Sequence, residues 1–319
     1  MRGYNLAAET QYQVGSNNVK GTLLLVDDDL NIVELITNVL EDLLTNYEYR
    51  LVSVSNGEEA WTILKKNSEL YDVVLLDRKI PGMDGLTILQ HMKSHSVLKT
   101  ARVIIQTGLV ATSDILDGMR EGASHYLTKP YNNEILKTIV RTAIEERETY
   151  KKLLEQNGED QHILSMLTSA DFHIKTINEA NELAGILARV SPNPEQAVIG
   201  FLELLINAIE HGNLGIGYKE KSKLVLEGEW EQVIQNRLLL DIHKNKTVHV
   251  KLIRSDKSLE VHIRDQGEGF DWRKYLDFDE KRMFDIHGRG IAMTNKIYFK
   301  NLEYRDCGNH VIVSFDNEN

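Results

Sequence analysis

The stretch VVLLDRKIPGMDG at residues 73–85 decides the fold of the first half of the chain. Its apolar start predicts a buried strand, and the Pro and Gly residues that follow Asp77 predict a turn directly after that strand. Similar short apolar segments precede and follow it, and helical patterns separate them. The expected strands are Thr22–Val26, Leu51–Val54, Val73–Leu76, Val103–Ile105 and His125–Leu127, and the expected helices are Leu30–Leu44, Glu58–Lys66, Leu86–Lys93, Asp114–Glu121 and one from Asn132 to about Glu155. This alternation predicts an α/β fold, namely a doubly wound, parallel, five-stranded sheet with helices on both faces.

Polar side chains stand at the carboxyl ends of these strands, where an open parallel sheet places its reactive groups. The first strand ends at Asp27 and Asp28, the third at Asp77, the fourth at Thr107, and the fifth runs into Lys129. Converging carboxylates repel one another unless a cation lies among them, and Mg²⁺ is the hard, oxygen-seeking candidate. A carboxylate beside Mg²⁺ can accept a phosphoryl group while the metal and Lys129 neutralise the developing charge.

Four blocks, LLLVDDD (23–29), VVLLDRKIPGMDG (73–85), VIIQTG (103–108) and HYLTKP (125–130), together resemble response-regulator receiver domains with a flavodoxin-like fold. The resemblance implies that Asp77 is the phosphoacceptor. It also implies that Mg²⁺ is held by Asp27, Asp28, Asp77 and the main-chain carbonyl of Lys79, that Thr107 and Lys129 contact the phosphoryl oxygens, and that Tyr126 is the aromatic side chain that moves inward on activation. We interpret the additional acid, Asp29, as the N-cap of the next helix.

The pattern changes towards the C-terminus, and four segments of the chain are expected: a flexible tail (1–20), a receiver domain (21–144), a helical linker (145–170) and a second domain (171–319). The linker segment EERETYKKLLEQNGED is too charged for a core, so a linker helix or a short dimerising coil is expected there. Segregated helices and an antiparallel or mixed sheet are expected in the second domain. Its expected elements are the strand FHIK (172–175), helices Asn178–Val190, Glu195–His211 and Ile291–Tyr298, a helix in GEWEQVIQNRLLLDI (228–242), and strands Val248–Arg254, Leu259–Arg264, Leu302–Arg305 and Val311–Phe315.

Three blocks of the second domain carry chemistry: ELLINAIEHGN (203–213), DQGEGF (265–270) and HGRGIAM (287–293). Glu203 and Asn207 are four residues apart on one helix, so they lie on the same face. An amide oxygen at Asn207 can complete a Mg²⁺ shell, and a carboxylate at Glu203 can orient or deprotonate a nucleophile. Asp265 can accept from an exocyclic amine of a base that Gly267 and Gly269 let approach. Gly288, Arg289 and Gly290 precede a helix whose first amides can hold phosphates.

In this order the three blocks resemble the ATP-binding boxes of the superfamily shared by histidine kinases, Hsp90-type chaperones, gyrase and MutL. The resemblance implies an α/β sandwich of the Bergerat type. It also implies ATP and Mg²⁺ as cofactors, Asn207 as a Mg²⁺ ligand, Glu203 as the catalytic base, Asp265 as the adenine reader and Asp271–His287 as a lid. FHIKTINEANELAGILA (172–188) followed by ELLINAIEHGN is most similar to the anti-sigma-factor serine kinases. Two features depart from that branch: the longer connection Leu214–Thr247, and GNHVIVSF (308–315) where a Gly-Thr pair is usual.

The composition and net charge indicate which classes of partner the protein can have. The chain has 319 residues, 42% of them hydrophobic and 27% charged, which fits two globular domains. Its net charge of −11 argues against a nucleic-acid surface. Cys307 stands alone, and no apolar run fits a secretory signal or a membrane span, so we expect a cytoplasmic location and no membrane contact. The expected partners are an upstream sensor histidine kinase, a downstream protein of the anti-sigma antagonist or sigma-factor type, and a second copy in a homodimer.

These observations favour a two-component response regulator in which Asp77 controls an ATP-binding output domain acting as a Ser/Thr protein kinase or anti-sigma-type regulator. Two alternatives stay open. One is a non-catalytic switch that sequesters a partner when it is loaded with ATP, and the other is an unorthodox histidine kinase. His162 has the wrong flanking residues for a phosphorylated histidine, and we interpret it as a solvated residue of the linker.

Overall fold

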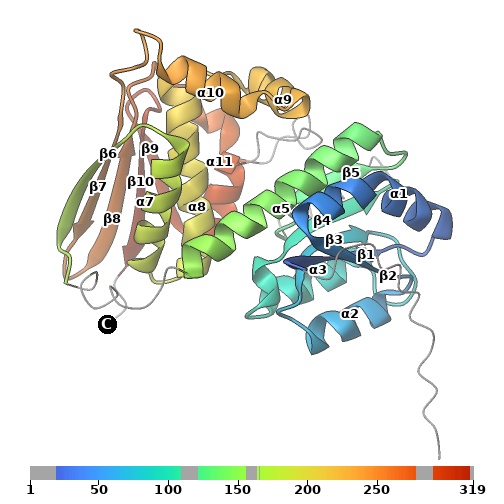
Figure 1. Cartoon of the computed structure of the whole chain (residues 1–319). Helices are drawn as coiled ribbons and strands as arrows, with labels where there is room; N and C mark the ends of the chain where they lie inside the picture. The colour runs from blue at the N-terminus through green and yellow to red at the C-terminus, as the bar shows by residue number, and fades with distance from the viewer. Residues whose placement is uncertain (1–18, 109–120, 156–163, 165, 278–289, 317–319) are drawn as a thin grey trace, which may run out of the picture. The chain divides into compact units, whose positions relative to one another are not determined.

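The computed structural model describes residues 19–108, 121–155, 164, 166–277 and 290–316 (Figure 1). The chain divides into two compact units, Met1–Arg147 and Glu148–Asn319. The boundary falls within a continuous helix, Asn133–Glu155, close to the start of the helical linker that the sequence predicts over 145–170. Among the described residues, no helix is both long enough and apolar enough to cross a bilayer.

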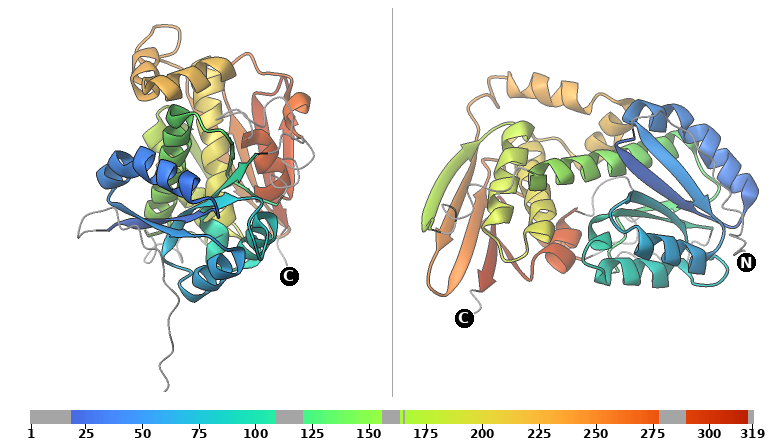
Figure 2. Two further views of the ribbon diagram at one scale, coloured as in Figure 1. Left: turned by 90° about the vertical axis from the view of Figure 1, so that its right-hand side faces the viewer. Right: turned by 60° about the horizontal axis from the view of Figure 1, so that its bottom comes forward.

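The first unit is a parallel sheet with the strand order β2-β1-β3-β4-β5. All five strands lie where the sequence predicted them. Helices α1 and α5 cover one face of this sheet, and α2 and α3 cover the other (Figures 1 and 2). The elements are β1 (Gly21–Val26), α1 (Leu30–Tyr47), β2 (Tyr49–Val54), α2 (Gly57–Lys66), β3 (Tyr71–Asp77), α3 (Gly85–Ser94), a 3₁₀ turn (Leu98–Thr100), β4 (Arg102–Thr107), β5 (His125–Thr128) and α5 (Asn133–Glu155). The expected helix Asp114–Glu121 lies almost wholly outside the described residues.

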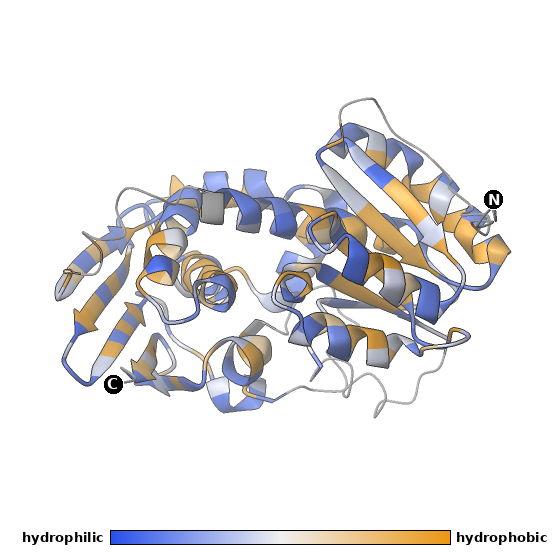
Figure 3. Cartoon of the chain, turned by 90° about the horizontal axis from the view of Figure 1, so that it is seen from below, coloured by the Kyte–Doolittle hydropathy of each residue, from blue (hydrophilic) through white to orange (hydrophobic). Residues whose placement is uncertain are grey.

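The central strands of this sheet are buried on both faces, which explains their unbroken apolar sequences. Every residue of β1, β3 and β4 is buried. The strands of the second unit instead alternate between apolar and polar residues, as Figure 3 shows by hydropathy. This difference is expected between a parallel sheet that helices cover on both faces and an antiparallel sheet that they cover on one.

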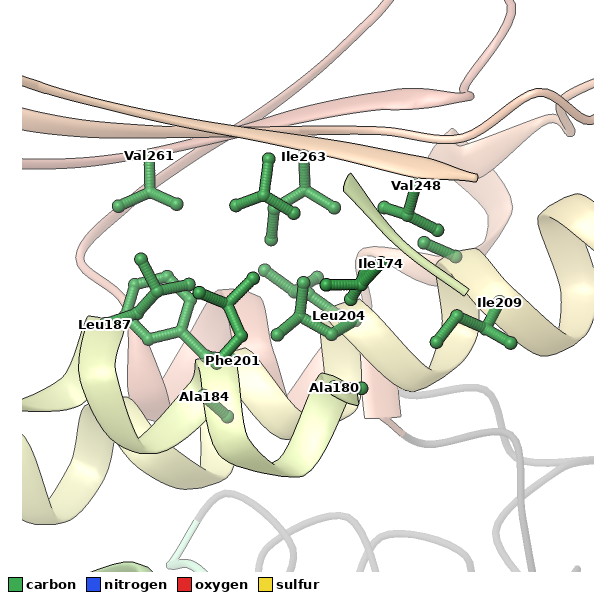
Figure 4. Packing of buried hydrophobic residues seen from close by; sticks show 14 of the residues in the cluster. Ile174, Ala180, Ala184, Leu187, Phe201, Leu204, Ile209, Val248, Val261 and Ile263 are labelled. Atoms are coloured by element: carbon green, nitrogen blue, oxygen red, sulfur yellow. The ribbon is translucent and has the colours of Figure 1, made fainter. Parts of the chain in front are cut away.

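The second unit is a fully antiparallel sheet with the strand order β6-β7-β8-β10-β9. Helices α7 and α8 cover one of its faces, and Leu187, Phe201 and Leu204 point towards Val261 and Ile263 of β8 (Figure 4). Its elements are β6 (Ser169–Ile174), α7 (Ile177–Arg189), α8 (Pro194–Asn207), a π-helical turn (Ala208–Asn213), α9 (Tyr218–Glu227), α10 (Trp230–Leu238), β7 (Val248–Arg254), β8 (Ser258–Arg264), a 3₁₀ turn (Trp272–Tyr275), α11 (Gly290–Met293), a second π-helical turn (Thr294–Tyr298), β9 (Asn301–Arg305) and β10 (His310–Asp316).

Part of the segment assigned to a linker belongs to the core of the second unit. Tyr150 and Leu153 of α5 are 3% and 6% exposed and pack in the same apolar cluster as α7 and α8. Strand β6 begins at Ser169, two residues before the expected domain start, and pairs with β7 along its whole length. The high charge of the sequence 145–160 favoured a solvated segment, so the burial of these two side chains was not predicted.

The connection 214–247 contains two helices where the sequence indicated one. Helix α9 was missed, because only Leu224 of its ten residues is buried and its pattern is therefore weak. Gly228 adopts φ 71° and ends α9 with a left-handed cap. Helix α10 stops at Leu238 rather than Ile242, because the amide of Leu240 bonds to the carbonyl of Arg237 three residues back and so leaves the helical pattern.

Candidate functional site

Three carboxylates meet at the carboxyl edge of the parallel sheet. Asp27 follows β1, Asp28 comes next, and Asp77 is the last residue of β3. One oxygen of each lies within 4.8 Å of the others. Asp27 is fully buried and Asp77 is 8% exposed, whereas Asp28 faces solvent. The pairing of β1 with β3 in the parallel sheet brings these residues together, as the sequence predicted.

Lys129 supplies a positive charge to this cluster. Its Nζ donates to Asp27 Oδ2 over 2.6 Å and to Asp77 Oδ2 over 2.5 Å. Burial lowers the pKa of the Lys129 ammonium, but the two hydrogen bonds and the charges of both carboxylates more than offset this, so the pKa is raised. Burial raises the pKa of Asp27, and Lys129 and the amide of Asp29 offset this only in part. Lys129 is therefore a firmly charged group between two buried carboxyls.

The turn after β3 depends on close backbone approach. A Cβ on Gly85 would lie 2.4 Å from the carbonyl oxygen of Asp77, so only glycine fits there. The amide of Lys79 donates to Asp77 Oδ1 over 3.0 Å and orients that carboxylate. Asp29 caps α1 by accepting from the amide of Asn31 over 2.9 Å, which confirms its expected role.

The predicted switch residues Thr107 and Tyr126 lie on the neighbouring strands β4 and β5. Thr107 ends β4, is 3% exposed, and accepts with its main-chain oxygen from the amide of Lys129 over 2.8 Å. Tyr126 lies on β5 and is 4% exposed. Tyr131, which was not among the predicted site residues, donates from its hydroxyl to Oε1 of Gln106. Burial and the charges of Asp27 and Asp77 raise the pKa of Tyr131, which places it in the field of the acidic cluster. Its position directly after Lys129-Pro130 is the signal that could have found it.

A second constellation joins the three blocks of the C-terminal unit. On α8, Nδ2 of Asn207 donates to Oε1 of Glu203 over 3.3 Å, so these residues are neighbours as predicted. A Cβ on Gly290 would lie 1.5 Å from Oε1 of Glu203, so the third block lies directly against the first. The amide of Gln266 donates to Oδ1 of Asn213 over 2.8 Å, which joins the second block to the first.

Asp265 lies where these blocks meet. A Cβ on Gly212 would lie 2.3 Å from Cγ of Asp265, and one on Gly267 would lie 2.3 Å from the carbonyl oxygen of Gly212. Oδ1 of Asp265 accepts from the amide of Gly267 over 2.8 Å. Burial nevertheless raises the pKa of Asp265 to about 6. The protein thus keeps a carboxyl group in a place that disfavours its charged form.

Some residues of the predicted nucleotide site have another structural role or lie outside the described residues. Gly269 adopts φ +78°, and a Cβ there would lie 2.3 Å from the carbonyl oxygen of Cys307. The close approach of these two backbone segments therefore already requires glycine at this position. Gly288 and Arg289 lie outside the described residues, as do 278–287 of the expected lid. The expected helix after them is a four-residue α-helix that continues as a π-helical turn.

Comparison with known proteins bears on the first unit. Residues 23–141 match the family described as "Response regulator receiver domain". The chain is 26% identical over 217 residues to 3',5'-cyclic-nucleotide phosphodiesterase regA of Dictyostelium discoideum, which covers 65% of this chain and 27% of that one. It is 27% identical over 214 residues to response regulator PleD of Caulobacter vibrioides, which covers 67% of this chain and 44% of that one. It thus spans less than half the length of either relative.

A solved structure with a comparable likeness is that of a putative response regulator from Chloroflexus aurantiacus. It shares 31% identity and covers 39% of this chain and 98% of its own, with a TM-score of 0.36. The family match coincides with the unit that carries the acidic edge, the strand order β2-β1-β3-β4-β5 and the pairing of Lys129 with Asp77. Residues 23–141 of this chain are a response regulator receiver domain.

Proposed function

We propose that the chain is a two-component response regulator in which Asp77 accepts a phosphoryl group from an upstream histidine kinase and thereby controls an ATP-dependent C-terminal unit. The observation that carries the first part is the contact of Lys129 with two buried carboxylates at the edge of the sheet. Asp77 is the candidate acceptor because it ends a central strand and its Oδ1 accepts from the amide of Lys79.

The acidic edge fits a divalent cation. Asp27, Asp28 and Asp77 bring three negative charges, and Lys129 returns one positive charge, so two negative charges remain. Hard carboxylate oxygens of this kind suit Mg²⁺. When bound, Mg²⁺ would neutralise charge on the phosphoryl oxygens, and these three carboxylates are the residues that would hold it.

The proposed reaction is a phosphoryl transfer from a phosphohistidine. An oxygen of the Asp77 carboxylate forms a bond to phosphorus while the P–N bond breaks, and the electron pair leaves with the imidazole. Lys129, kept protonated by its neighbours, stabilises the transferred group through its ammonium. We assign to Thr107, at the end of the neighbouring strand, a hydrogen bond to the product, and to Tyr126 the role of the aromatic switch.

Phosphorylation by acetyl phosphate tests this part. The full chain, incubated with acetyl phosphate and Mg²⁺, should show a slower band on a phosphate-affinity gel, and Asp77→Asn should not. Asp84→Asn is a matched control, because Asp84 is a nearby acid that only caps α3. Labelling of Asp77→Asn at the wild-type level would refute the assignment.

For the C-terminal unit we propose ATP binding, with protein Ser/Thr kinase or anti-sigma-type regulation as its output. The support is the meeting of three distant blocks: Glu203 lies against Gly290, and Gly212 lies against Asp265. In this proposal Asn207 holds a Mg²⁺ of the nucleotide, Glu203 is the base that takes a proton from a Ser or Thr hydroxyl, and Asp265 accepts from the adenine amine. Glu203 and Asn207 of α8 face the same region, because they hydrogen-bond to each other.

Nucleotide binding and transfer can be separated by experiment. A fluorescent ATP analogue should bind the full chain, and Asn207→Ala and Asp265→Asn should each weaken it at least tenfold, whereas Glu203→Gln should mainly remove transfer. Label from γ-labelled ATP that is stable to acid on a second protein would support Ser/Thr transfer. Unchanged affinity in both Asn207→Ala and Asp265→Asn would refute the site.

A further inference from the structure

We propose that Gln106 supplies a further hydrogen-bond donor to the phosphorylated form of Asp77, and that Tyr131 is the positioning residue that holds the Gln106 amide for this role. Gln106, like Tyr131, was not among the predicted site residues. The inference rests on the proposed phosphorylation of Asp77, because it names two residues of the first unit that act on the product of that reaction.

Gln106 lies directly beside Asp77 in the parallel sheet. It is the next-to-last residue of β4, and its Cα is the partner of the Asp77 Cα in the pairing of β3 with β4. The amide of Arg78 donates to the carbonyl of Gln106 over 3.0 Å and so fixes this register at the end of both strands. Neighbouring strands lie about 4.8 Å apart, and residues in register on parallel strands direct their side chains to the same face. The side chains of Gln106 and Asp77 therefore start side by side.

The amide of Gln106 carries an unused donor. Its Oε1 accepts from the hydroxyl of Tyr131, which leaves Nε2 as the other end of the amide. Gln106 is 0% exposed, and its Nε2 has no hydrogen-bond partner among the residues that the structure describes. A buried donor without an acceptor costs free energy, and such groups are rare in folded proteins. An acceptor that the protein gains in another state would offset this cost.

A phosphoryl group on Asp77 is an acceptor of that kind. It adds strong acceptor oxygens and negative charge next to the position of Gln106. The donors already described at Asp77, Nζ of Lys129 and the amide of Lys79, contact its carboxylate before any phosphorylation. Nε2 of Gln106 instead gains a bond in the phosphorylated form without giving one up. Because the gain occurs in one form only, it shifts the equilibrium towards that form.

Tyr131 keeps the Gln106 amide in the orientation that this role needs. It follows Lys129 by two residues, and its hydroxyl engages the oxygen of the amide and not the nitrogen. Burial and the charges of Asp27 and Asp77 raise the pKa of Tyr131, so the hydroxyl keeps its proton and acts as a donor. The same charges show that the pair lies close to the acidic edge at which the phosphoryl group would arrive.

The test replaces the polar pair by an apolar pair of similar shape. Gln106→Leu combined with Tyr131→Phe removes both hydrogen-bonding partners together with the unpaired amide, so the midpoint of urea unfolding should stay the same or rise. The probe is beryllofluoride, an analogue of the phosphoryl group on aspartate, which is titrated into the full chain with saturating Mg²⁺ and followed by fluorine NMR. We expect the double variant to bind beryllofluoride at least tenfold more weakly than the wild type, the effect of one hydrogen bond to a charged group.

Two single variants complete the test. Tyr131→Phe keeps the Gln106 amide but removes its anchor, so it should weaken beryllofluoride binding about threefold, less than the double variant does. Tyr47→Phe is the matched control, because the hydroxyl of Tyr47 on α1 also donates to a side chain, that of Glu145, and its loss should leave the affinity unchanged.

The outcomes separate the inference from the proposed function. A wild type that binds no beryllofluoride would refute both the phosphorylation of Asp77 and the role of Gln106. Equal affinity of the wild type and the double variant would overturn the role of Gln106 alone. A weaker affinity that comes with an equally large loss of stability in urea would also overturn it, because the pair would then only support the fold.

Discussion

Replacing Lys221 by Met should destabilise the C-terminal unit strongly, because it removes the partner of a buried acid. Glu210 lies on the π-helical turn after Asn207 and is fully buried. Its Oε2 accepts from Nζ of Lys221 on α9 over 2.6 Å, and its Oε1 accepts from the indole of Trp230 on α10 over 2.5 Å. The pair therefore fastens the connection 214–247 to the helix that carries the proposed nucleotide ligands.

The expected loss follows from the burial of both partners. The side chain of Lys221 is 13% exposed and that of Glu210 is 0% exposed. Removing one member of a buried ion pair costs about 3–5 kcal/mol, because the other charge stays buried without compensation. Trp230→Phe leaves the ion pair and removes one hydrogen bond, so its loss should be smaller, about 1–3 kcal/mol. Glu210→Gln combined with Lys221→Met removes both charges and should recover much of the loss.

Urea unfolding of the full chain measures these differences. Trp61 lies in the first unit, and Trp230 and Trp272 lie in the second, so a Trp61→Phe background makes tryptophan fluorescence report on the C-terminal unit for the lysine and glutamate variants. Trp230→Phe is followed by circular dichroism. A loss below about 1 kcal/mol for Lys221→Met, or a double variant as unstable as the single one, would refute the view that the ion pair with Lys221 compensates the burial of Glu210.

Three further predictions concern charged side chains whose pKa values are shifted by burial or by a close partner. Lys129→Met leaves Asp27 and Asp77 buried and mutually repelling, so urea unfolding at pH 8 should show a loss of about 2–4 kcal/mol. This loss should be smaller at pH 4, because burial raises the pKa of Asp27 and that carboxyl becomes protonated there. Burial lowers the pKa of Lys93 from 10.5 to about 7, so between these pH values the unfolded chain holds a proton on Lys93 that the folded chain has lost. The stability of the wild type relative to Lys93→Met, measured by thermal unfolding, should therefore rise from pH 7 towards pH 10. Burial raises the pKa of Asp265 from 3.8 to about 6, so ionisation of this carboxyl lowers the stability of the fold as the pH rises from 4 to 6. The free energy of unfolding of Asp265→Asn at pH 7.5 should therefore be about 1–3 kcal/mol higher than that of the wild type, while its nucleotide affinity is lower.

The parallel sheet could be predicted from the sequence because burial on both faces leaves unbroken apolar strands such as Leu23–Val26 and Val73–Leu76. Its acidic edge followed, since parallel strands bring their carboxyl ends together. Helix α9 could not be predicted in the same way, because one buried leucine in ten residues carries almost no periodicity. The contact of Glu210 with Lys221 and Trp230 was equally hidden, because it joins residues 11 and 20 positions apart through side chains that each suit a solvated helix.

The glycines and the acids of the C-terminal blocks carry different kinds of information. A side chain at Gly212 or Gly267 would collide with Asp265 or with neighbouring backbone, so packing of the chain alone requires glycine there. These glycines are therefore explained by the fold and are weak evidence for a ligand. Asp265 is different, because burial opposes its charge although Oδ1 accepts a hydrogen bond from the amide of Gly267. A protein that keeps such a group beside Gly212, close to the helix that carries Asn207 and Glu203, accepts an energetic cost that a bound amine donor would offset, and this adds to the support that the meeting of the three blocks gives to the proposed nucleotide site.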